Sequence, residues 1–419
     1  MNDPRVLHIG PSELQGAVHV SGAKNSALRL LAASLLTSNA VELQNYPSGL
    51  LDVQIHEGML KALGKQIIHL GPDSLRICEG HPVGSELIWR ERSIRNTLLI
   101  LGALVARTGR GSVPLPGGCR LGERKYDLHV MLLEKLGARV WDDGVSLFAE
   151  AAGGLRGADI HLPIRSTGAT ENALLAASLA SGTTRIWNPH IRPEILDLVA
   201  LLREMGAEIS VFGQEHIQVV GVPELSGAVH RVLPDNMEAV TWLVAAVMTG
   251  GDVEIHDFPR RDMEVVLTHL VAAGARIYEG DQSVIVRGGR CYPLEISTGP
   301  HPGINSDVQP ILAAWCANAV GQSRIVDLRF PGRYGYAEEM AKMGLQSRIE
   351  GDFLVIDGRG GGLKGADVRA LDLRAGAALA LCGLVADGET VVHDAWQIFR
   401  GYNDFVGKLK ALGGNVSHA

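Results

Sequence analysis

Long hydrophobic runs are missing from this chain of 419 residues, and so are runs of lysine and arginine. No segment reaches the roughly 18–20 consecutive apolar residues that a membrane-spanning helix needs, so we expect no membrane partner. The net charge is −7, and without a basic run this balance argues against nucleic acid as a partner. Residues 1–6 lack the charged and then apolar pattern of a signal peptide, which favours a cytoplasmic location.

Cysteine is scarce as well. The chain has five cysteines at irregular spacing, and such an odd, scattered set indicates neither a disulfide framework nor a metal site. Cys316 and Cys382 lie in apolar segments of helical character, where we expect them to pack as small core hydrophobes. Cys78 and Cys291 have no sequence context that indicates chemistry.

What the chain does contain is a repeat of about 70 residues, a period that decides the fold class. An amphipathic segment ends in Leu-Gly or a close equivalent six times, and a short β-type run follows. A glycine just past a helix end supplies the left-handed residue that a C-cap needs. The six glycines are Gly64, Gly137, Gly206, Gly274, Gly344 and Gly413.

Each repeat has a second, strongly apolar helical segment. These segments cover residues 27–36, 97–106, 173–180, 240–248, 308–320 and 377–386. A helix that is apolar on nearly every face is a buried helix, and a β-type run follows each one. We therefore predict an α/β fold with helices inside and sheets outside, an inside-out barrel.

A chain of this length is too long for one hydrophobic core and fits two domains of three repeats each. We place the first domain at residues 22–232 and the second at 1–21 together with 233–419. The opening strand at residues 6–10 would complete the sheet of the C-terminal half, so that the chain crosses twice between domains. Two crossings suit a cleft that opens and closes on a ligand, and we expect the active site in this interdomain cleft.

Polar residues gather just before the apolar helices. They occur at residues 21–25, 95–96, 165–168, 234–236, 305–307 and 372–374. One interpretation is structural, because Ser, Thr, Asp and Asn are the preferred N-caps of helices. It applies to Thr167, Ser306, Asp307 and Asp372.

Capping does not explain the cations at these helix starts, Lys24, Arg95 and Arg374. A cation at a helix N-terminus opposes the helix dipole. A cation at this position is favourable if an anionic ligand binds both to the cation and to the free backbone N–H groups of the helix start. The pattern therefore predicts a ligand rich in phosphate or carboxylate.

One loop, residues 113–125, stands apart because it contains two prolines and three glycines. Prolines and glycines favour defined turns, so we expect such a segment to form turns at the surface. It contains Cys119, flanked by Arg120, Arg124 and Lys125, whose charges would lower the pKa of the thiol. Cys119 is therefore a candidate nucleophile or proton donor, and the alternative is a cysteine that simply occupies a loop.

Several short motifs occur in order along the chain. They are Ser-Gly-Ala-Lys-Asn at 21–25, Leu-Pro-Gly-Gly-Cys at 115–119, Gly-Glu-Arg at 122–124, Asp-Leu-His at 127–129, Pro-His-Pro-Gly at 300–303, Asp-Leu-Arg-Ala at 372–375 and Arg-Gly-Tyr at 400–402. Each alone is weak, but the ordered set resembles the UDP-N-acetylglucosamine enolpyruvyl transferase (1-carboxyvinyltransferase) family. The resemblance extends from about residue 6 to residue 416.

The resemblance implies two inside-out α/β domains of three repeats each. It also implies transfer of the enolpyruvyl group of phosphoenolpyruvate to the 3-hydroxyl of UDP-N-acetylglucosamine with release of phosphate, the first committed step of peptidoglycan synthesis. The family uses no metal and no organic cofactor. Its partners are these small-molecule substrates, and the oligomeric state stays open.

The resemblance also implies residue roles. Lys24, Arg124 and Arg400 would hold the phosphate and carboxylate of phosphoenolpyruvate, with Arg95 and Arg374 in support. Phosphoenolpyruvate carries roughly three negative charges near neutral pH, so several cations must line its site.

Three residues would carry the chemistry together with Lys24. Cys119 would deliver a proton to the methylene carbon or take part in phosphate release, and its exposed thiol implies sensitivity to the epoxide fosfomycin. Asp307 would be the general base at the sugar hydroxyl, and Asp372 would handle a proton nearby. The resemblance also implies contacts to the nucleotide sugar. Asn25 would contact the sugar, Asp127, Leu128 and His129 the uracil, and Ser166, Thr167 and Gly168 the diphosphate. Arg333 is a further implied substrate-binding residue.

The chain departs from the family pattern mainly toward the acceptor side. The departures are Lys125 and Tyr126 after Arg124, Ile164 beside Arg165, Asn236, residues 304–306 before Asp307, and Asn403. An enolpyruvyl transferase acting on another uridine nucleotide such as UMP is therefore the alternative. The enolpyruvyl transferase of aromatic amino-acid synthesis fits less well, because its family lacks the cysteine loop.

The sixfold repeat is also compatible with two non-enzymatic interpretations. Six αβ repeats could form a ring-shaped clamp on DNA, but such a ring needs a basic inner face, and the bodies of the predicted inner helices are apolar. A paralogue that only binds its ligand is the other alternative. Substituting Cys119 or Asp307 separates the classes, because only an enzyme would lose phosphate release.

Overall fold

The computed structural model describes residues 6–92, 94–115 and 126–418. The chain divides into two compact units. Unit 1 comprises Met1–Ser21, Gly49–Leu51 and Pro234–Ala419, and unit 2 comprises Gly22–Ser48 and Asp52–Leu233.

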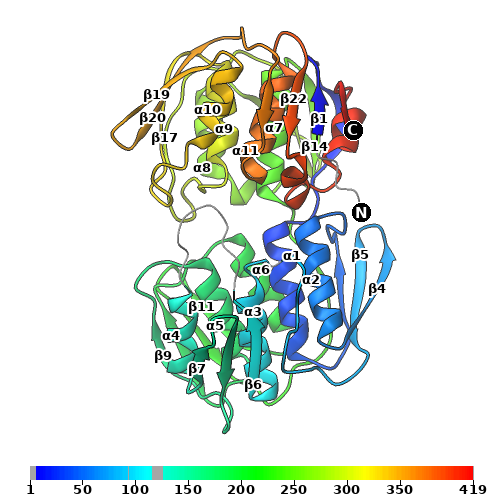
Figure 1. Cartoon of the computed structure of the whole chain (residues 1–419), viewed down its shortest axis with the longest axis vertical. Coiled ribbons are helices and arrows are strands. Elements are labelled where there is room, and N and C mark those ends of the chain that lie inside the picture. The colour runs from blue at the N-terminus through cyan, green and yellow to red at the C-terminus, as the bar shows by residue number, and fades with distance from the viewer. Residues whose placement is uncertain (1–5, 93, 116–125, 419) are drawn as a thin grey trace. The chain divides into compact units, whose positions relative to one another are not determined.

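Unit 1 combines α-helices with four-stranded sheets (Figure 1). Its helices are α7 (Asn236–Met248), η2 (Arg260–Asp262), α8 (Glu264–Ala272), α9 (Gln309–Asn318), α10 (Gly335–Lys342), α11 (Leu373–Leu384), η3 (Ala395–Arg400) and α12 (Phe405–Ala411). Its strands are β1 (Val6–Ile9), β2 (Gln15–His19), β14 (Asp252–His256), β15 (Arg276–Glu279), β16 (Ser283–Arg287), β17 (Glu295–Ser297), β18 (Val320–Val326), β19 (Gln346–Glu350), β20 (Phe353–Arg359), β21 (Asp367–Arg369), β22 (Thr390–His393) and β23 (Val416–His418). The described strands form the sheets β21-β22-β1-β23, β15-β16-β14-β2 and β17-β18-β20-β19.

Unit 2 is built in the same manner. Its helices are α1 (Lys24–Ala33), η1 (Ser34–Leu36), α2 (Leu51–Ala62), α3 (Thr97–Thr108), α4 (Asp127–Lys135), α5 (Thr167–Ala177) and α6 (Pro193–Glu204). Its strands are β3 (Val41–Gln44), β4 (Lys65–Gly71), β5 (Ser74–Glu79), β6 (Arg110–Pro114), β7 (Arg139–Asp142), β8 (Ser146–Glu150), β9 (Asp159–His161), β10 (Thr183–Trp187), β11 (Glu208–Phe212), β12 (His216–Val220) and β13 (Ala228–Arg231). They form the sheets β11-β12-β10-β9, β13-β3-β5-β4 and β6-β8-β7.

The apolar helices form the centre of each unit. Every residue of α7 is buried, and so is every residue of α9 and α11 except Asn318 and Leu373. These three helices contact one another in unit 1, and α3 contacts both α1 and α5 in unit 2. Figure 1 shows α9 and α11 with strands of unit 1 on both sides of them. The buried helices confirm the burial predicted from their composition, because sheets cover the faces that water would otherwise reach.

Each four-stranded sheet begins with a parallel strand pair, to which antiparallel strands are added. The parallel pairs are β9 with β10, β13 with β3, β2 with β14, β17 with β18, and β21 with β22. In the three-stranded sheet, a single parallel bridge from Glu86 to Ser112 occupies the corresponding edge. The same pairing scheme therefore recurs in both units.

The opening strand β1 belongs to the C-terminal part of the chain. It pairs antiparallel with β22 and β23, and Figure 1 shows the blue strand β1 beside β22. Leu7 and Ile9 of this strand are fully buried in the core of unit 1. This pairing confirms the prediction that residues 6–10 complete a sheet of the C-terminal half.

Apart from the short segment Gly49–Leu51, the chain passes between the units at residues 21–22 and 233–234. At both passages a strand pairs in the unit that the chain is leaving: β2 pairs with β14 in unit 1, and β13 pairs with β3 in unit 2. A Cβ atom on Gly22 would lie 1.9 Å from the carbonyl oxygen of Asn45. No other residue fits at Gly22 without a shift of the backbone, which explains the glycine of the first motif.

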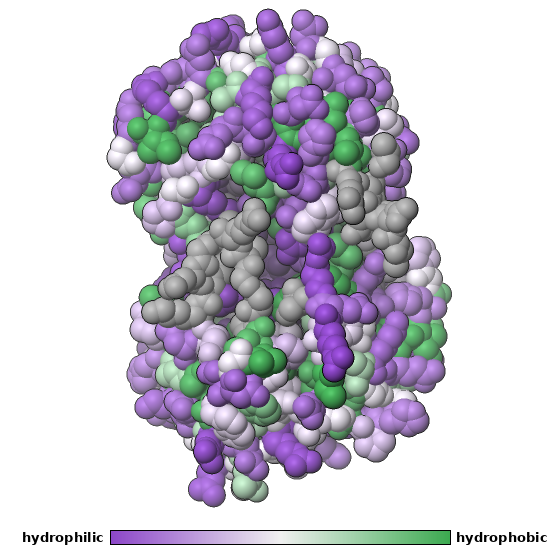
Figure 2. Space-filling model, in the orientation of Figure 1, coloured by the Kyte–Doolittle hydropathy of each residue, from purple (hydrophilic) through white to green (hydrophobic). Residues whose placement is uncertain are grey.

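The surface carries no large apolar region on the face drawn in Figure 2, where hydrophobic residues form small separate patches among hydrophilic ones. Within the described ranges, no helix is both long and apolar enough to cross a membrane.

A polar network around the buried His230 joins α1, α6 and β13 in unit 2. His230 lies between two carboxylates: its Nε2 is 3.0 Å from Asp197 and its Nδ1 is 2.9 Å from Glu204. Asp197 also accepts a hydrogen bond from Ser26 of α1. Burial lowers the pKa of His230, but the hydrogen bonds and charges of Asp197 and Glu204 outweigh burial and raise the pKa above its ordinary value. Only the protonated imidazole can donate to both carboxylates at once.

This network predicts a stability that falls at alkaline pH. Because the pKa of His230 is raised in the folded state, its contribution is fully present below the unfolded pKa of about 6.5 and is lost as pH rises through the folded pKa. Urea unfolding between pH 5 and pH 9 should show this decline in the wild type and a smaller one in His230→Gln. The matched control is His81→Gln, at an exposed histidine, which should keep the wild-type slope. Equal slopes in wild type and His230→Gln would contradict the assignment.

Candidate active site

Unit 1 brings together three predicted site residues that lie just ahead of three different helices. Asp307 precedes α9, Arg333 precedes α10 and Asp372 precedes α11. The guanidinium of Arg333 bridges the two carboxylates, with Nη1 3.0 Å from Asp307 Oδ1 and Nη2 3.2 Å from Asp372 Oδ2. The Arg333 side chain is only 7% exposed, whereas that of Asp307 is 31% exposed. The reachable member of the cluster is therefore the predicted general base.

The two carboxylates keep Arg333 charged. Burial alone would lower the pKa of Arg333, but the charges of Asp307 and Asp372 raise it above its ordinary value. The guanidinium holds both carboxylates by charge-assisted hydrogen bonds. Asp307 is thus held in a fixed orientation, which a base at a hydroxyl group requires.

The capping interpretation holds for only some of the polar residues. Asp372 caps α11, because its Oδ1 accepts from the N–H groups of Arg374 at 2.8 Å and Ala375 at 2.9 Å. Its other oxygen faces Arg333, so Asp372 combines a structural and a chemical position. Asp307 does not cap α9, whose N-cap is Val308.

Arg374 is the most unusual cation of the cluster. Its side chain is fully buried, and its guanidinium lies over the ring of Tyr402 at 4.9 Å. None of its three nitrogens has a hydrogen-bond partner of normal geometry among the described residues. Burial lowers its pKa, but the neighbouring Tyr402, Asp235 and Asp307 raise the pKa above its ordinary value. A buried cation with unused N–H groups is the arrangement that an incoming anion would complete.

In unit 2, Lys24 begins α1 as the family motif requires. Its ammonium lies 3.5 Å from Asp52 of α2, and both residues are buried. Ala23 is the N-cap of this helix and gives no side-chain cap. Asn25, next in the helix, is half-buried. A cation and uncapped N–H groups at one helix end suit an anionic group.

A second group in unit 2 joins α4 to α5. His129 is buried, and its Nδ1 lies 3.0 Å from the amide nitrogen of Asn172, which donates to it. Burial, together with the charge of Arg95, lowers the pKa of His129 to about 3, so the ring is neutral. A Cβ atom on Gly168 would lie 3.3 Å from His129 Nε2, so the glycine allows this close approach.

The segment before α5 has the geometry of an anion-binding helix start. Ser166 is the N-cap, accepting from the N–H of Ala169 at 3.4 Å, so the cap is Ser166 rather than Thr167. Thr167 Oγ1 lies 2.8 Å from His190 Nδ1. The free N–H groups of this turn and the positive end of the helix dipole favour a phosphate.

The other predicted residues are more scattered. Asp127 is exposed and Leu128 half-buried in the first turn of α4. Arg400 ends η3, where its Nη1 lies 3.0 Å from Gln397 Oε1. Cys119 and Arg124 lie outside the described residues.

Four contributors were not predicted from the sequence. Asp52 and Asn172 carry no motif, since a lone carboxylate or amide in an amphipathic helix is ordinary. Tyr402 belongs to the Arg-Gly-Tyr motif at residues 400–402. That motif was the one sequence feature that pointed to Tyr402, whose ring lies on Arg374. The buried carboxylate of Asp327 gave no signal at all.

Cys316 and Cys382 are core cysteines whose thiols stay protonated. Burial raises the pKa of both Cys316 and Cys382 to about 12. The prediction that they pack as core hydrophobes is confirmed.

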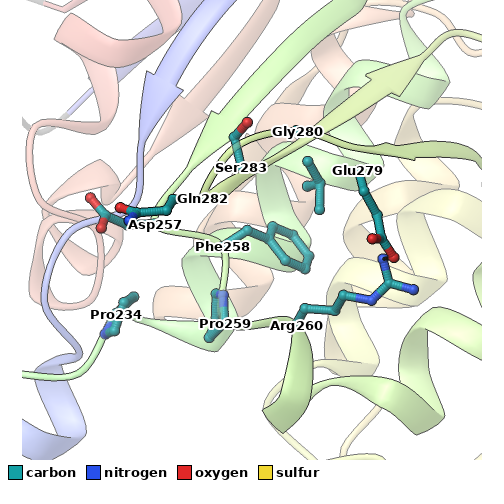
Figure 3. A pocket seen from close by; sticks show the side chains of 10 residues that line it. Pro234, Asp257, Phe258, Pro259, Arg260, Glu279, Gly280, Gln282 and Ser283 are labelled. Atoms are coloured by element: carbon teal, nitrogen blue, oxygen red, sulfur yellow. Dashed lines mark ion pairs between the residues drawn. The ribbon is translucent and has the colours of Figure 1, made fainter.

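A pocket of about 350 Å³ lies elsewhere in unit 1 (Figure 3). Arg260 and Glu279 form an ion pair there, and Phe258 lies between them and Pro234 in the view drawn. None of the predicted substrate residues lines it. In the part of the chain that the structure describes, no group of three or more His, Cys, Asp or Glu side chains is placed to hold a metal ion.

Comparison with known protein sequences gives a consistent result. The family model described as EPSP synthase (3-phosphoshikimate 1-carboxyvinyltransferase) matches residues 9–409. A UDP-N-acetylglucosamine 1-carboxyvinyltransferase of Methylocella silvestris is 39% identical, over 98% of each chain. Another, from Carboxydothermus hydrogenoformans, is 39% identical over 97% of each chain.

Solved structures give the same fold. The enolpyruvyl transferase NikO from Streptomyces tendae matches with a TM-score of 0.88 at 27% identity, covering 99% of this chain and 98% of that one. EPSP synthase from Acinetobacter baumannii matches with a TM-score of 0.74 at 17% identity, over 99% of each chain, which shows the fold alone. Because the family model and the near-full-length relatives agree with the ordered motifs, the chain belongs to the enolpyruvyl transferase family and is related most evidently to its UDP-N-acetylglucosamine 1-carboxyvinyltransferases.

Proposed function

We propose that this protein transfers the enolpyruvyl group of phosphoenolpyruvate to the 3-hydroxyl of UDP-N-acetylglucosamine and releases phosphate, the first committed step of peptidoglycan synthesis. The observation that carries the proposal is the 39% identity, over 98% of the chain, to an enzyme named for this reaction. We place the reaction in the cytoplasm, with no metal or organic cofactor.

The unit 1 cluster supplies the base and part of the anion site. Asp307 would take the proton of the acceptor hydroxyl, since its carboxylate is accessible and is oriented by Arg333. Asp372 would handle a second proton on the other side of the same guanidinium. Arg374 would receive a negatively charged oxygen of phosphoenolpyruvate, because its buried guanidinium N–H groups have no hydrogen-bond partner of normal geometry among the described residues.

Unit 2 supplies further anion contacts. Lys24 and Arg124 would bind phosphoenolpyruvate, and Arg95 would support them. Arg400, which the resemblance assigns to the same anion, belongs to unit 1. The turn at Ser166, Thr167 and Gly168 would bind the diphosphate of the nucleotide, since it is a helix start with free N–H groups. Asp127, Leu128 and His129 would contact the uracil, and Asn25 the sugar.

The reaction balances in two steps. The acceptor oxygen bonds to C2 of phosphoenolpyruvate as Asp307 takes its proton, and an acid protonates the methylene carbon to give a tetrahedral phosphate adduct. Loss of a proton from that methyl carbon then restores the double bond and expels phosphate. Cys119 would be the acid at the methylene carbon or would assist phosphate departure. Water must be excluded throughout, because it would compete for the activated C2.

An acceptor such as UMP is the second candidate. The departures from the family pattern support it, and one of them acts directly on the base: Asn305 Oδ1 accepts from the backbone N–H of Asp307 at 3.0 Å. A second departure, Asn236, is buried at the start of α7. These residues would then set the acceptor rather than the transfer chemistry.

Phosphate release from phosphoenolpyruvate tests the function. The purified protein should release phosphate with UDP-N-acetylglucosamine, and not with UMP or 3-phosphoshikimate. Release with UMP alone would transfer the assignment to the second candidate. Release with none of the three, in a folded protein, would overturn the proposed function.

Arg374 gives a sharper prediction, because its buried guanidinium has N–H groups that an anionic ligand would complete. Arg374→Met should lower phosphate release by about 100-fold or more in a protein that still folds. The control is Arg29→Met, which breaks a buried ion pair with Glu171 at 2.6 Å and should cost about 3–5 kcal/mol of unfolding free energy. Strong destabilisation by Arg374→Met with unimpaired turnover would show that the side chain is structural.

Cys119 predicts inactivation by fosfomycin. A thiolate would open the epoxide by forming a C–S bond while the epoxide oxygen takes up a proton, so activity should be lost and one adduct should appear by mass spectrometry. Cys119→Ser should show no adduct. The control Cys78→Ser, at the half-buried cysteine of β5, should be labelled like the wild type. An adduct that persists in Cys119→Ser would assign the reactive thiol to another position.

A further inference from the structure

Asp327 is a fully buried carboxylate at the end of β18, only 1% exposed. It accepts hydrogen bonds on both oxygens. Oδ2 accepts from Ser306 Oγ at 2.5 Å, and Oδ1 accepts from Thr298 Oγ1 at 2.8 Å. Oδ1 also accepts from the backbone N–H groups of Arg329 at 2.9 Å and Phe330 at 3.0 Å.

We propose that Asp327 is a positioning residue for the reaction, which through Ser306 sets the place of Arg333 against the base Asp307. The proposal rests on the proposed function, in which Asp307 is the base. No motif of the sequence includes Asp327.

The oxygen Oδ2 acts through Ser306. The Ser306 hydroxyl has one proton, and donating it to Asp327 leaves the oxygen lone pairs for an incoming donor. Arg333 Nη1 lies 3.4 Å from that oxygen and 3.0 Å from Asp307 Oδ1. The same guanidinium nitrogen is therefore shared between Ser306 and the base. The direction of the Ser306 hydroxyl, which Asp327 dictates, decides whether this sharing is attractive.

The oxygen Oδ1 acts through the segment that leads to Arg333. By binding the N–H groups of Arg329 and Phe330, it holds the turn that runs from β18 toward α10. The backbone N–H of Asp327 lies 3.0 Å from the hydroxyl of Tyr334, the residue after Arg333, and that hydroxyl donates to the carbonyl of Asp352 at 2.7 Å. The segment is thus tied to Asp327 before and after Arg333.

Only a carboxylate satisfies this set. Four donors face the two oxygens, and an ionised carboxyl group has only acceptor sites. An asparagine would keep one oxygen for the turn but would present an N–H₂ group to Ser306. The Ser306 hydroxyl would then accept at that side, and its proton would point elsewhere, toward the guanidinium that cannot accept it. Asp327→Asn should therefore disturb Arg333 while leaving most of the turn intact.

The test compares two hydroxyls on the same carboxylate. Ser306→Ala removes the donor that faces Arg333, and Thr298→Val removes a donor, also buried, on the other oxygen. Each hydroxyl also accepts one hydrogen bond, Ser306 from Arg333 Nη1 at 3.4 Å and Thr298 from the backbone N–H of Leu328 at 3.0 Å. Each variant therefore loses two hydrogen bonds and should lower the melting temperature to a similar extent. Ser306→Ala and Asp327→Asn should lower kcat for phosphate release by about tenfold or more with KM values within about threefold, because an oriented base acts in the transition state. Thr298→Val should keep kcat within about threefold of wild type.

Rescue by a conservative change completes the test. Ser306→Thr retains the hydroxyl and should restore most of kcat. Equal losses of kcat in Ser306→Ala and Thr298→Val would overturn the proposal, since the effect would then be general destabilisation. So would wild-type kcat in Asp327→Asn.

A readout without turnover separates this proposal from the proposed function. In ¹⁵N-arginine spectra of the full chain, the side-chain resonance of Arg333, assigned with Arg333→Lys, should shift in Ser306→Ala and Asp327→Asn and stay in place in Thr298→Val. If the wild type released no phosphate with any acceptor but these shifts occurred, the function would fail and the positioning network would stand. An unmoved Arg333 resonance in an active enzyme would reject the network alone.

Discussion

A guanidinium group that is removed from water must be compensated by carboxylates, by an aromatic surface or by a ligand anion. Unit 1 uses the first two solutions in adjacent places. Arg333 is compensated by Asp307 and Asp372, and Arg374 lies on Tyr402 with its N–H groups unused among the described residues. The difference between these two arginines divides the cluster by role. Arg333 orders two carboxylates through hydrogen bonds, whereas Arg374 is stabilised by an aromatic ring and keeps its guanidinium N–H groups for an anion.

The fold provides the surroundings in which these two arginines are buried. Helices such as α7, α9 and α11 are apolar on all faces and are enclosed by sheets, so their N-terminal ends are the natural places for polar groups. Each of these starts is used differently. Asp235 and Asp372 cap α7 and α11, while the start of α9 carries a carboxylate that caps nothing and faces Arg333 instead. One repeated architecture thus gives caps at some helix starts and chemistry at others.

Asp327 shows how far a site reaches beyond the groups that would touch substrate. Its carboxylate lies behind Ser306 and beneath the turn before Arg333, and it contacts neither Asp307 nor Arg333 through any hydrogen bond described. Its influence passes through the direction of one hydroxyl. Such a residue differs from a core residue in a testable way, because its replacement would change turnover more than its lost hydrogen bonds change stability.

The sequence by itself determined the class of the fold and the family. The apolar helices, the glycine that ends each outer helix and the ordered motifs are local patterns, and local patterns survive in a one-dimensional chain. It also placed the candidate residues Lys24, Asp307, Asp372 and Arg374, since each stands at the start of a predicted helix. Their proposed roles, like the domain boundaries, remain predictions.

Only the tertiary structure decided which of these residues meet. Asp307 lies 26 residues before Arg333 in the chain, and Asp372 lies 39 residues after it. No spacing rule predicts that the guanidinium of Arg333 joins these two carboxylates. The pairing of Lys24 with Asp52, the stacking of Arg374 on Tyr402 and the reach of Asp327 have the same origin. The physical reason is that burial and hydrogen-bond direction depend on packing between distant segments, which the order of residues along the chain does not state.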